Sequence, residues 1–464
     1  MGKYFYPVAA DQACFKNKYR IPNIPCVREM AEQVLSLPLH EELTESEIDY
    51  ITDLFKKGAG GTMMKKLMLL GGSRYLLPVI ESAHNLGIST ITCDYLPDNI
   101  AHKYSDEYCN VSVIEKEEVL KIAREKNIDG IMSFACDPGV VTAAYVAEKM
   151  GLPFQCSYET ATILQDKGKF RQFLLDNGFN CPHAKRYTDK DAPFADIDYF
   201  NWPVIVKPTD SAGSKGVTKV DDKENLLTAI EVAINASHNH AFIIEDFLTF
   251  EGYHSDTDPF TVDGILKFIS FSDQLFDKDA DNPYTPAYII WPSSMKIEYQ
   301  NELVSEIQRL MTLLGMKNGI YNIESCAANG KAYIMEVSPR GGGCKIAELQ
   351  KMAYGVDFIE NEVRKAVGME LTEITQTDCN GYWCEMVIHA KSGHSGVLKN
   401  ISIASDIENK YVKRVDISAK TGDYVKPFTG ANMALGDIFL RFDSREELDT
   451  IISKSDEWLH VDLE

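Results

Sequence analysis

Short apolar runs alternate with amphipathic segments from residue 63 onward. "KKLMLL" (65–70) is apolar enough for a buried strand, and "YLLPVIESAHNLG" (75–87) then repeats apolar positions at helical spacing. "ISTITCDYL" (88–96) and "EEVLKIAREKNIDGIMSFACD" (117–137) continue the alternation. Strands that alternate with helices predict a parallel sheet with right-handed crossovers, which is a Rossmann-like arrangement.

The pattern changes further along the chain. From about residue 156 to 371, helices, strands and glycine-rich loops follow one another in an α+β order. After about 372, alternating segments such as "GYWCEMVIHA" and "LGDIFLRF" predict strands, and "SREELDTIISKSDEWL" predicts a closing helix. The expected fold class is therefore α/β and α+β, with a Rossmann-like domain first and a β-rich region last.

Residues 1–57 stand apart as a short helical appendage. "VREMAEQVLSLPLH" is amphipathic, and Thr44 and Glu47 have the spacing of a helix capping box. "GAGGT" (58–62) has the composition of a flexible linker. The expected units are the appendage (1–57), the linker (58–62), a Rossmann-like domain (63–155), a second domain (156–371) with a lid at about 185–250, and a β-rich region (372–464).

Composition narrows the function classes. Of 464 residues, 47 are Lys or Arg and 69 are Asp or Glu, so the net charge is −22, which argues against nucleic acid or an anionic membrane as a partner. The eleven cysteines include no CxxC pair, which argues against a disulfide framework or a zinc site.

Gly71-Gly72 lacks the full GxGxxG pattern of NAD-binding proteins. No apolar run is long enough for a membrane span, so we expect a cytoplasmic location.

A lysine and a glycine-rich loop follow the β-branched run "WPVIV" (202–206). Lys207 ends this run, and "SAGSKGV" (211–217) then places small residues and a second lysine in a loop. Backbone N–H groups of such a loop approach phosphate oxygens closely. The candidate phosphate ligands are Lys207, Gly213, Ser214, Lys215 and Gly216. The alternative is a surface hairpin with solvated lysines.

The segment "HAFIIEDFLTFEGYH" (240–254) predicts a strand that is followed by residues suited to contact a nucleoside. Glu245, Phe247 and Leu248 follow apolar positions, so backbone groups there would contact the edge of a flat heterocycle while apolar side chains cover its faces. His254 is a candidate ribose contact, and a structural histidine is the alternative.

Glu324 and Glu336 flank Asn329-Gly330 at a spacing of twelve residues. A two-residue turn at Asn329-Gly330 would place the glutamates on opposite faces of the hairpin. A three-residue loop, Ala328 to Gly330, would place them on one face along a diagonal of roughly 7–8 Å. Carboxylates on one face suit Mg²⁺, which also keeps water and phosphate oxygens as ligands. The alternative is a pair of solvated glutamates.

Arg340 and three glycines come directly after this hairpin. An always-charged, planar guanidinium suits a carboxylate or a phosphate, and the amides of Gly341–Gly343 would be open to an oxyanion. The alternative is an arginine at a helix end after a glycine turn.

In their order, these motifs resemble the ATP-grasp superfamily of carboxylate–amine ligases. The matching segments are "QDKGKFR" (165–171), "PVIVKP", "SAGSKGV", "IIEDFL", "IES" and "MEVSPRGGG". The resemblance extends over residues 63–464 and favours the biotin-carboxylase-like and amino-acid-ligase branch. It implies an ATP-grasp domain at 156–371.

The resemblance assigns roles to single positions. Lys167 and Lys207 would contact the nucleotide, and residues 213–216 would close over its phosphates. Glu245 to Leu248 would bind adenine. His254 would contact the ribose. Glu324 and Glu336 would bind Mg²⁺, with Mn²⁺ as an alternative. Arg340 and Lys207 would serve the reacting phosphate. Ser338 occupies the place where the family usually has a metal-ligating asparagine.

Residues 1–57 resemble a second family, the last stretch of the DegT/DnrJ/EryC1/StrS nucleotide-sugar aminotransferases, with "VLSLPLHEELTESEIDYI" as the specific part. The catalytic lysine of those enzymes lies far upstream of this stretch, so no PLP is expected. The stretch is either an orphaned remnant or a record of the pathway, which would be amino-sugar assembly for a surface polysaccharide.

The sequence therefore predicts an ADP-forming ligase that acylates the amine of a nucleotide-linked amino sugar. The alternatives are a dipeptide-forming L-amino-acid ligase, a carbamoyl- or carboxyl-transferring synthetase and a non-catalytic ATP-binding scaffold. The expected partners are a small carboxylate and an amine, without nucleic acid or membrane, and a homodimer is the candidate assembly. Lys215, Arg340 and Lys345 are the cations expected to attract an anionic substrate.

Overall fold

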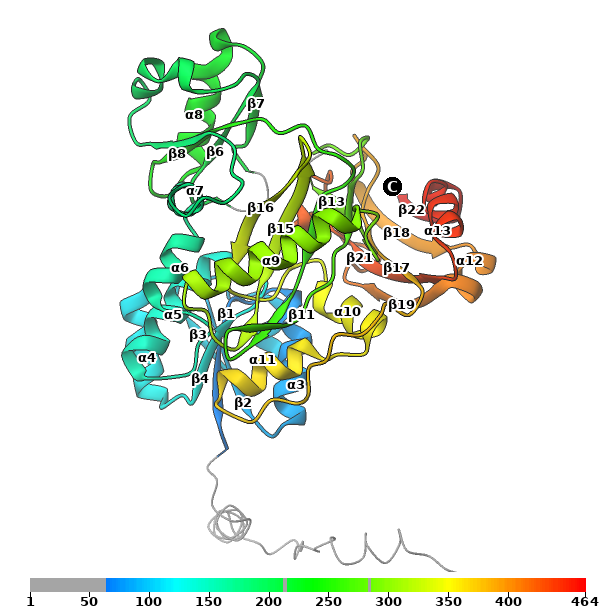
Figure 1. Ribbon diagram of the computed structural model, residues 1–464. Helices are drawn as coiled ribbons and strands as arrows, with labels where there is room; N and C mark the ends of the chain where they lie inside the picture. Colours follow the sequence, from blue (N-terminus) through cyan, green and yellow to red (C-terminus); the bar gives the residue numbers. More distant parts are fainter. Residues whose placement is uncertain (1–63, 212–214, 283–284) are drawn as a thin grey trace, which may run out of the picture. The chain divides into compact units, whose positions relative to one another are not determined.

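The computed structural model describes residues 64–211, 215–282 and 285–464 (Figure 1). The predicted appendage and linker, and Gly213 and Ser214 of the predicted phosphate loop, lie outside the described residues. No helix in the described part of the chain is both long enough and apolar enough to span a membrane.

The first sheet is parallel, as the sequence predicts. Its strands are β1 (Lys66–Leu70), β2 (Ser89–Asp94), β3 (Glu107–Asn110) and β4 (Gly130–Ser133), in the spatial order β3-β2-β1-β4. The connecting helices are α3 (Leu77–Asn85), α4 (Lys116–Lys126) and α5 (Asp137–Met150). Every residue of β1 after Lys66 is buried, because apolar side chains cover both faces of this sheet.

A second, antiparallel sheet follows the helices α6 (Tyr158–Leu164) and α7 (Lys167–Asp176). It runs β5-β8-β6-β7, with β5 at Ala184–Tyr187, β6 at Val204–Pro208, β7 at Thr218–Val220 and β8 at Phe242–Asp246. Helix α8 (Leu226–Ala236) packs its apolar side against β6. This unit occupies the segment for which the sequence predicts a lid.

The central layer joins strands from three places in the chain. One sheet has the order β16-β15-β9, with β9 at Ser255–Thr257, β15 at Asn322–Ala328 and β16 at Lys331–Ser338. A small neighbouring sheet contains β10 (Phe260–Val262), β11 (Ile265–Phe268) and β14 (Gly319–Ile320). Helix α9 (Ile297–Leu313) packs against β16.

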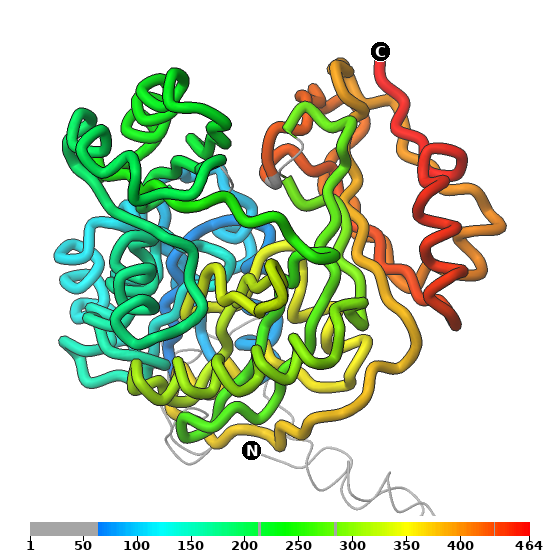
Figure 2. The backbone as a smooth tube through the Cα atoms, turned by 45° about the horizontal axis from the view of Figure 1, so that its top comes forward, coloured from blue at the N-terminus to red at the C-terminus, as the bar shows by residue number. Residues whose placement is uncertain are grey.

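The C-terminal region is built on a five-stranded sheet with the order β12-β13-β17-β21-β19. Figure 2 shows the chain around β12 (Asp273–Phe276) and β13 (Pro286–Trp291) beside strands that lie about a hundred residues later. Helix α10 (Ile346–Tyr354) contacts β17, while α13 (Arg445–Ile452) contacts β17 and β21. The remaining elements are α11 (Phe358–Ala366), β17 (Tyr382–Ile388), β18 (Gly396–Ile403), α12 (Ser405–Tyr411), β19 (Val412–Ile417), β20 (Tyr424–Val425), β21 (Gly436–Phe442), α14 (Ser455–Trp458) and β22 (Leu459–Leu463).

Candidate functional site

Glu324 and Glu336 lie directly opposite each other on β15 and β16. The hairpin turn is the two-residue Asn329-Gly330 turn, with φ of 51° and 71°, and not the three-residue loop. A two-residue turn alone would put the glutamates on opposite faces, but the pairing shifts between Ser325 and Glu324. Met335 is the extra residue of this β-bulge, and it moves Glu336 to the face of Glu324.

Arg171 of α7 holds the bulge in place. Its guanidinium donates to the carbonyl oxygen of Met335 at 2.7 Å and pairs with the buried Glu245 at 3.3 Å. The arginine side chain is almost fully buried, so these contacts are shielded from water. The register that aligns the two glutamates is therefore fixed from a different element.

A third carboxylate extends the row. Asp256 on β9 pairs directly with Glu324, so Glu336, Glu324 and Asp256 occupy one line across three adjacent strands. The sequence analysis missed Asp256. The available signal was "SDTDPF" (255–260), where two acids alternate with positions that suit a strand.

Burial and the neighbouring Glu336 raise the pKa of Glu324 to about 7. Lys167 Nζ lies 3.1 Å from Glu336 Oε2, and it also donates to the Ser211 carbonyl oxygen at 3.3 Å. Burial alone would lower the pKa of Lys167, but Glu336 and Glu324 reverse this and raise it. The row therefore carries excess negative charge beside one firmly protonated lysine.

These residues fit a nucleotide-dependent magnesium site. Within the described ranges, no group of three or more His, Cys, Asp or Glu side chains could hold a metal ion by itself. Mg²⁺ is commonly bound by one or two carboxylates together with water and phosphate oxygens. Glu324 and Glu336 supply that number of oxygen ligands on one face.

Ser338 and Arg340 both contact Asp137 at the start of α5. Arg340 donates from Nε and Nη2 to the two oxygens of Asp137 at 2.9 and 2.7 Å. Ser338 Oγ donates to Asp137 at 2.8 Å and accepts from Gln165 at 2.7 Å, which leaves one lone pair for a metal ion. Asp137 was not among the sequence-predicted residues, because it precedes Arg340 by 203 positions.

The glycines after Arg340 are less open than the sequence suggests. The N–H of Gly342 donates to both carboxylate oxygens of Asp258, at 3.0 and 2.8 Å. Asn322 donates to Asp258 as well, at 3.1 Å. The expectation that all three glycine amides are open to an oxyanion is therefore wrong for Gly342, since a buried carboxylate already accepts from it.

The side chains of Lys207 and Glu245 meet across the neighbouring strands β6 and β8. Lys207 Nζ lies 3.3 Å from Glu245 Oε2, and Glu245 also pairs with Arg171. Burial would raise the pKa of Glu245, but Arg171 and Lys207 hold it below its usual range. The Glu245 side chain is thus an ionised bridge between two cations, so contacts to a heterocycle there would come from the backbone.

The backbone after Glu245 offers an open donor at Leu248. Phe247 N–H donates to the Pro203 carbonyl oxygen at 3.0 Å, whereas Leu248 N–H meets no acceptor among the described residues. The buried Leu248 side chain packs with Cys326 and Tyr333. A free amide beside an apolar surface is what the edge of a flat heterocycle requires.

His254 is partly buried between aromatic rings. Its ring centroid lies 3.9 Å from that of Phe250, in an edge-on arrangement. Burial and the nearby Lys207 lower the pKa of His254 to about 4, so the imidazole is neutral at physiological pH.

Lys215 and Gly216 are the described part of the predicted phosphate loop. Lys215 is exposed. Gly216 has a φ of +74°, and a Cβ there would approach the Ala236 Cβ to 2.5 Å. Glycine is therefore required at this position by the backbone conformation and by the close approach of α8.

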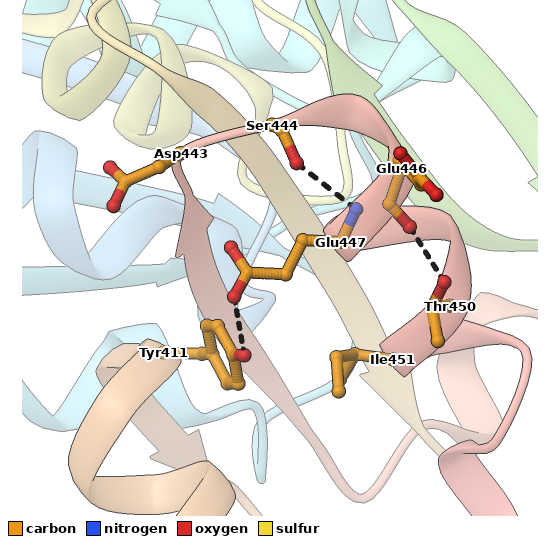
Figure 3. Close-up of a pocket in the computed structure, with 7 residues that line it drawn as sticks. All are labelled: Tyr411, Asp443, Ser444, Glu446, Glu447, Thr450 and Ile451. Carbon is orange, nitrogen blue, oxygen red and sulfur yellow. Dashed lines mark hydrogen bonds between the residues drawn. The ribbon is translucent and has the colours of Figure 1, made fainter.

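Two hollows lie away from this row. Figure 3 shows the first, which is lined by Tyr411, Asp443, Ser444, Glu446, Glu447, Thr450 and Ile451. Of its acids, Glu447 accepts a 2.7 Å hydrogen bond from Tyr411, and Asp443 accepts one from Arg441 at 2.8 Å. The second hollow is lined by both apolar and polar residues, with Phe154, Met316 and Lys365 among them. Neither contains a residue of the carboxylate row or of the lysine pairs.

Comparison with known proteins identifies an ATP-grasp domain in the part of the chain that carries these motifs. Residues 164–344 match the family model described as ATP-grasp domain. The carbamoyl phosphate synthase large chain of Pseudothermotoga lettingae is 23% identical over 318 residues, which are 67% of this chain and 28% of that protein. The chain thus spans little more than a quarter of this curated relative.

Two solved structures share the fold over their whole length. The L-amino acid ligase from Bacillus licheniformis has a TM-score of 0.71 at 21% identity, and the match covers 87% of this chain and 100% of that one. The phosphoribosylglycinamide synthetase from Anaerococcus prevotii has a TM-score of 0.69 at 20% identity, again with 87% and 100% coverage. The α/β and α+β fold class of the described residues is therefore the one that the sequence predicts.

Proposed function

Because the chain carries an ATP-grasp domain at residues 164–344, we propose that it is an ATP- and Mg²⁺-dependent ligase that joins a carboxylate to an amine through an acyl phosphate. The observation that carries this proposal is the alignment of Glu336, Glu324 and Asp256 beside Lys167. A row of carboxylates with lysines at its margin is suited to a magnesium-bound polyphosphate.

The reaction has two steps. A carboxylate oxygen of the acid attacks the γ-phosphorus of ATP, and the bond to the β-phosphate oxygen breaks to release ADP. The amine then attacks the carbonyl carbon of the acyl phosphate, inorganic phosphate leaves, and the nitrogen loses its proton to solvent. Neither step requires a covalent bond to the protein, so positioning and charge neutralisation are its main contributions.

The residues divide these tasks. Lys207 and Lys167 neutralise phosphate charge, Glu324 and Glu336 hold Mg²⁺, and the Leu248 amide contacts adenine. When bound, Mg²⁺ supplies positive charge between the carboxylates and the phosphates. Arg340 is positioned by Asp137 near the end of the row, where it stabilises the transferring phosphoryl group.

We propose a nucleotide-linked amino sugar as the amine. The motivating observation is that residues 1–57 resemble nucleotide-sugar aminotransferases, which would produce the amine that such a ligase consumes. The similar synthetase from Anaerococcus prevotii is named for a phosphoribosyl glycinamide, which is an amide attached to a sugar phosphate.

A second candidate is a ligase for amino acids. It is favoured because carboxylates of the protein pair with two of the cations that were expected to attract an anionic substrate. Arg340 is tied to Asp137, and Lys345 is tied to Asp416. Positive charge inside the site is therefore largely neutralised by the protein, which suits a substrate that carries an ammonium group.

One experiment separates these candidates. The full chain is given ATP, Mg²⁺ and a mixture of small carboxylic acids, together with either nucleotide-linked amino sugars or free amino acids, and ADP release is measured. Release with amino sugars supports the first candidate, and release with amino acids alone supports the second. Nucleotide binding without ADP release under any of these conditions would indicate a non-catalytic ATP-binding protein.

A further inference from the structure

Two cysteines lie side by side on adjacent strands of the first sheet. Cys93 on β2 pairs directly with Cys109 on β3 in the parallel register. Adjacent strands lie about 4.8 Å apart, which is inside the range of Cα separations, about 4.4–6.8 Å, that a disulfide bond spans. Both side chains are free thiols. We call Cys93 and Cys109 the thiol pair.

Both members of the thiol pair face helix α4. Cys93 belongs to the apolar core that includes Val119 and Ala123 of α4, and Cys109 packs against the same core. The two thiols share a hydrogen bond across the strands. The sulfur atoms are therefore already neighbours, and a bond between them requires no change in register.

The two thiols differ in exposure and in acidity. Cys93 is 0% exposed, whereas Cys109 is half-buried on β3, the edge strand of the sheet. The hydrogen bond from Cys93, and then the charge of Lys126 on α4, lower the pKa of Cys109 to about 7, although burial and Glu107 oppose them. The same hydrogen bond and burial raise the pKa of Cys93. An ionised thiol at the edge thus lies beside a protonated thiol in the core.

The other cysteines of the described ranges lack this combination. Burial raises the pKa of each of their thiols, which makes them poor nucleophiles. They are Cys136, Cys156, Cys181, Cys326, Cys344, Cys379 and Cys384. The thiol pair is therefore where an oxidant is expected to react first among these residues.

We propose that Cys93 and Cys109 form a reversible oxidation site, at which a hydroperoxide converts the two thiols into a disulfide bond. The Cys109 thiolate attacks a peroxide oxygen, so that an S–O bond forms, the O–O bond breaks and hydroxide leaves. The Cys93 sulfur then attacks the Cys109 sulfur, the S–S bond forms and the S–O bond breaks. The departing hydroxide takes the Cys93 proton and becomes water. This is one exchangeable bond and not a structural disulfide framework.

The bond would fasten the edge of the first sheet. Strand β3 is hydrogen-bonded within the sheet only to β2, so its outer side has no partner strand. The disulfide would close residues 94–108, and this connection also contacts β1, since the Ala101 N–H donates to the Gly72 carbonyl oxygen at 3.1 Å. Closing such a loop restricts local opening. We expect amide hydrogen exchange in β3 to slow at least about threefold on oxidation.

Peptide mapping after hydrogen peroxide treatment of the full chain tests the proposal. Free thiols are alkylated without reduction, and trypsin then separates the pair, because Cys93 falls in peptide 75–103 and Cys109 in peptide 104–116. We expect one joined species that is about 2 Da lighter than the sum of the two peptides, since two hydrogen atoms are lost. Dithiothreitol should restore the separate peptides.

Single variants assign the two roles. Cys109→Ser should abolish the joined species and leave Cys93 reduced, because a buried protonated thiol reacts poorly with peroxide. Cys93→Ala should stop the reaction at the sulfenic acid of Cys109, which dimedone traps. Cys379→Ser is the matched control, because Cys379 is also half-buried, and this variant should form the joined species as the wild type does.

A second measurement needs no oxidant. The rate at which iodoacetamide alkylates Cys109 is followed against pH in the full chain. The wild-type midpoint should lie near the lowered pKa of about 7. Cys93→Ala removes the hydrogen bond, so its midpoint should move toward the value of about 8.5 that an ordinary thiol has.

The outcomes separate clearly. Peptides 75–103 and 104–116 that stay unjoined throughout the peroxide titration would overturn the proposal. So would joining of Cys93 or Cys109 to other cysteines at a yield equal to that of the pair. An alkylation midpoint that is the same in wild type and Cys93→Ala would contradict the role of Cys93. If Cys93→Ala fails to fold, the wild type and Cys109→Ser decide, because Cys109 is half-buried at an edge and tolerates serine.

Discussion

Asp137 and Arg340 form a bidentate ion pair between the first domain and the segment after β16, with contacts of 2.9 and 2.7 Å. Arg340 is 7% exposed, so the pair is shielded from solvent. Asp137 also accepts from Ser338, and thereby holds two residues near the proposed metal site. Helix α5 thus sets the orientation of groups that lie about 200 positions later in the chain.

The first prediction concerns Asp137. Asp137→Asn should leave one acceptor for Arg340 and remove the charge that orients it. We expect kcat to fall about tenfold, with the Kd for ATP within about twofold, since Asp137 does not contact the nucleotide. Steady-state kinetics and calorimetry provide the two numbers. Asp106→Asn, which removes a surface partner of His84, is the control and should change neither.

The second prediction concerns Arg340 itself. Arg340→Ala should lower kcat by about 10²–10³, the usual cost of losing transition-state charge stabilisation. ATP should still bind, because Lys167 and Lys207 remain. Turnover within about twofold of the wild type would remove Arg340 from the mechanism. Arg340→Lys keeps the charge and loses the bidentate geometry, so it should lie between the two.

The third prediction concerns the pH dependence of stability without nucleotide or metal. The pKa of Glu324 is raised to about 7, above its value in the unfolded chain, so the folded state binds this proton more tightly. The stabilisation is present below the unfolded pKa and is lost as pH rises through about 7.

Glu324→Gln should therefore unfold at a higher Tm than the wild type at pH 8, and the difference should shrink toward pH 4.5. Thermal unfolding across this range measures it. The exposed Glu81→Gln should follow the wild type at each pH. A Tm difference that grows on acidification would show that burial and Glu336 do not raise the pKa of Glu324.

The fourth prediction concerns the buried Glu245. Glu245→Ala leaves Arg171 buried without its carboxylate, which should destabilise the protein by about 3 kcal/mol. Adding Arg171→Met should recover part of the loss, because an apolar side chain replaces the unpaired charge. Denaturant unfolding of the two single variants and the double variant measures the coupling. Strictly additive losses would contradict the pairing.

Local sequence patterns were sufficient to predict the parallel sheet and to place several candidate ligand-binding residues on their strands. Apolar runs that alternate with amphipathic helices predict the parallel sheet, and "PVIVKP" places Lys207 on strand β6, next to the strand that carries Glu245. These features depend on neighbouring residues in the chain. The helices follow from burial of one face, and the apolar strands of the first sheet from burial of both faces.

The alignment of Glu324 with Glu336 could not be derived from local pattern. The sequence left a two-residue turn and a three-residue loop open, and only the three-residue loop placed both glutamates on one face. The turn has two residues, and the bulge at Met335 reverses which residues share a face. The bulge is stabilised by Arg171, from an element more than 160 residues earlier. Asp137 and Asp256 escaped detection for the same reason, since each acquires its partners only when distant strands and helices pack.

The central claim is that the chain transfers a phosphoryl group to a carboxylate before the amide forms. The direct test uses the accepted acid with ¹⁸O in its carboxylate, together with ATP, Mg²⁺ and the accepted amine, and measures the isotope content of the inorganic phosphate released. An acyl-phosphate pathway predicts one ¹⁸O atom in each phosphate, because the C–O bond breaks when the amine attacks. Phosphate without ¹⁸O, formed at the same rate as ADP, would contradict the account.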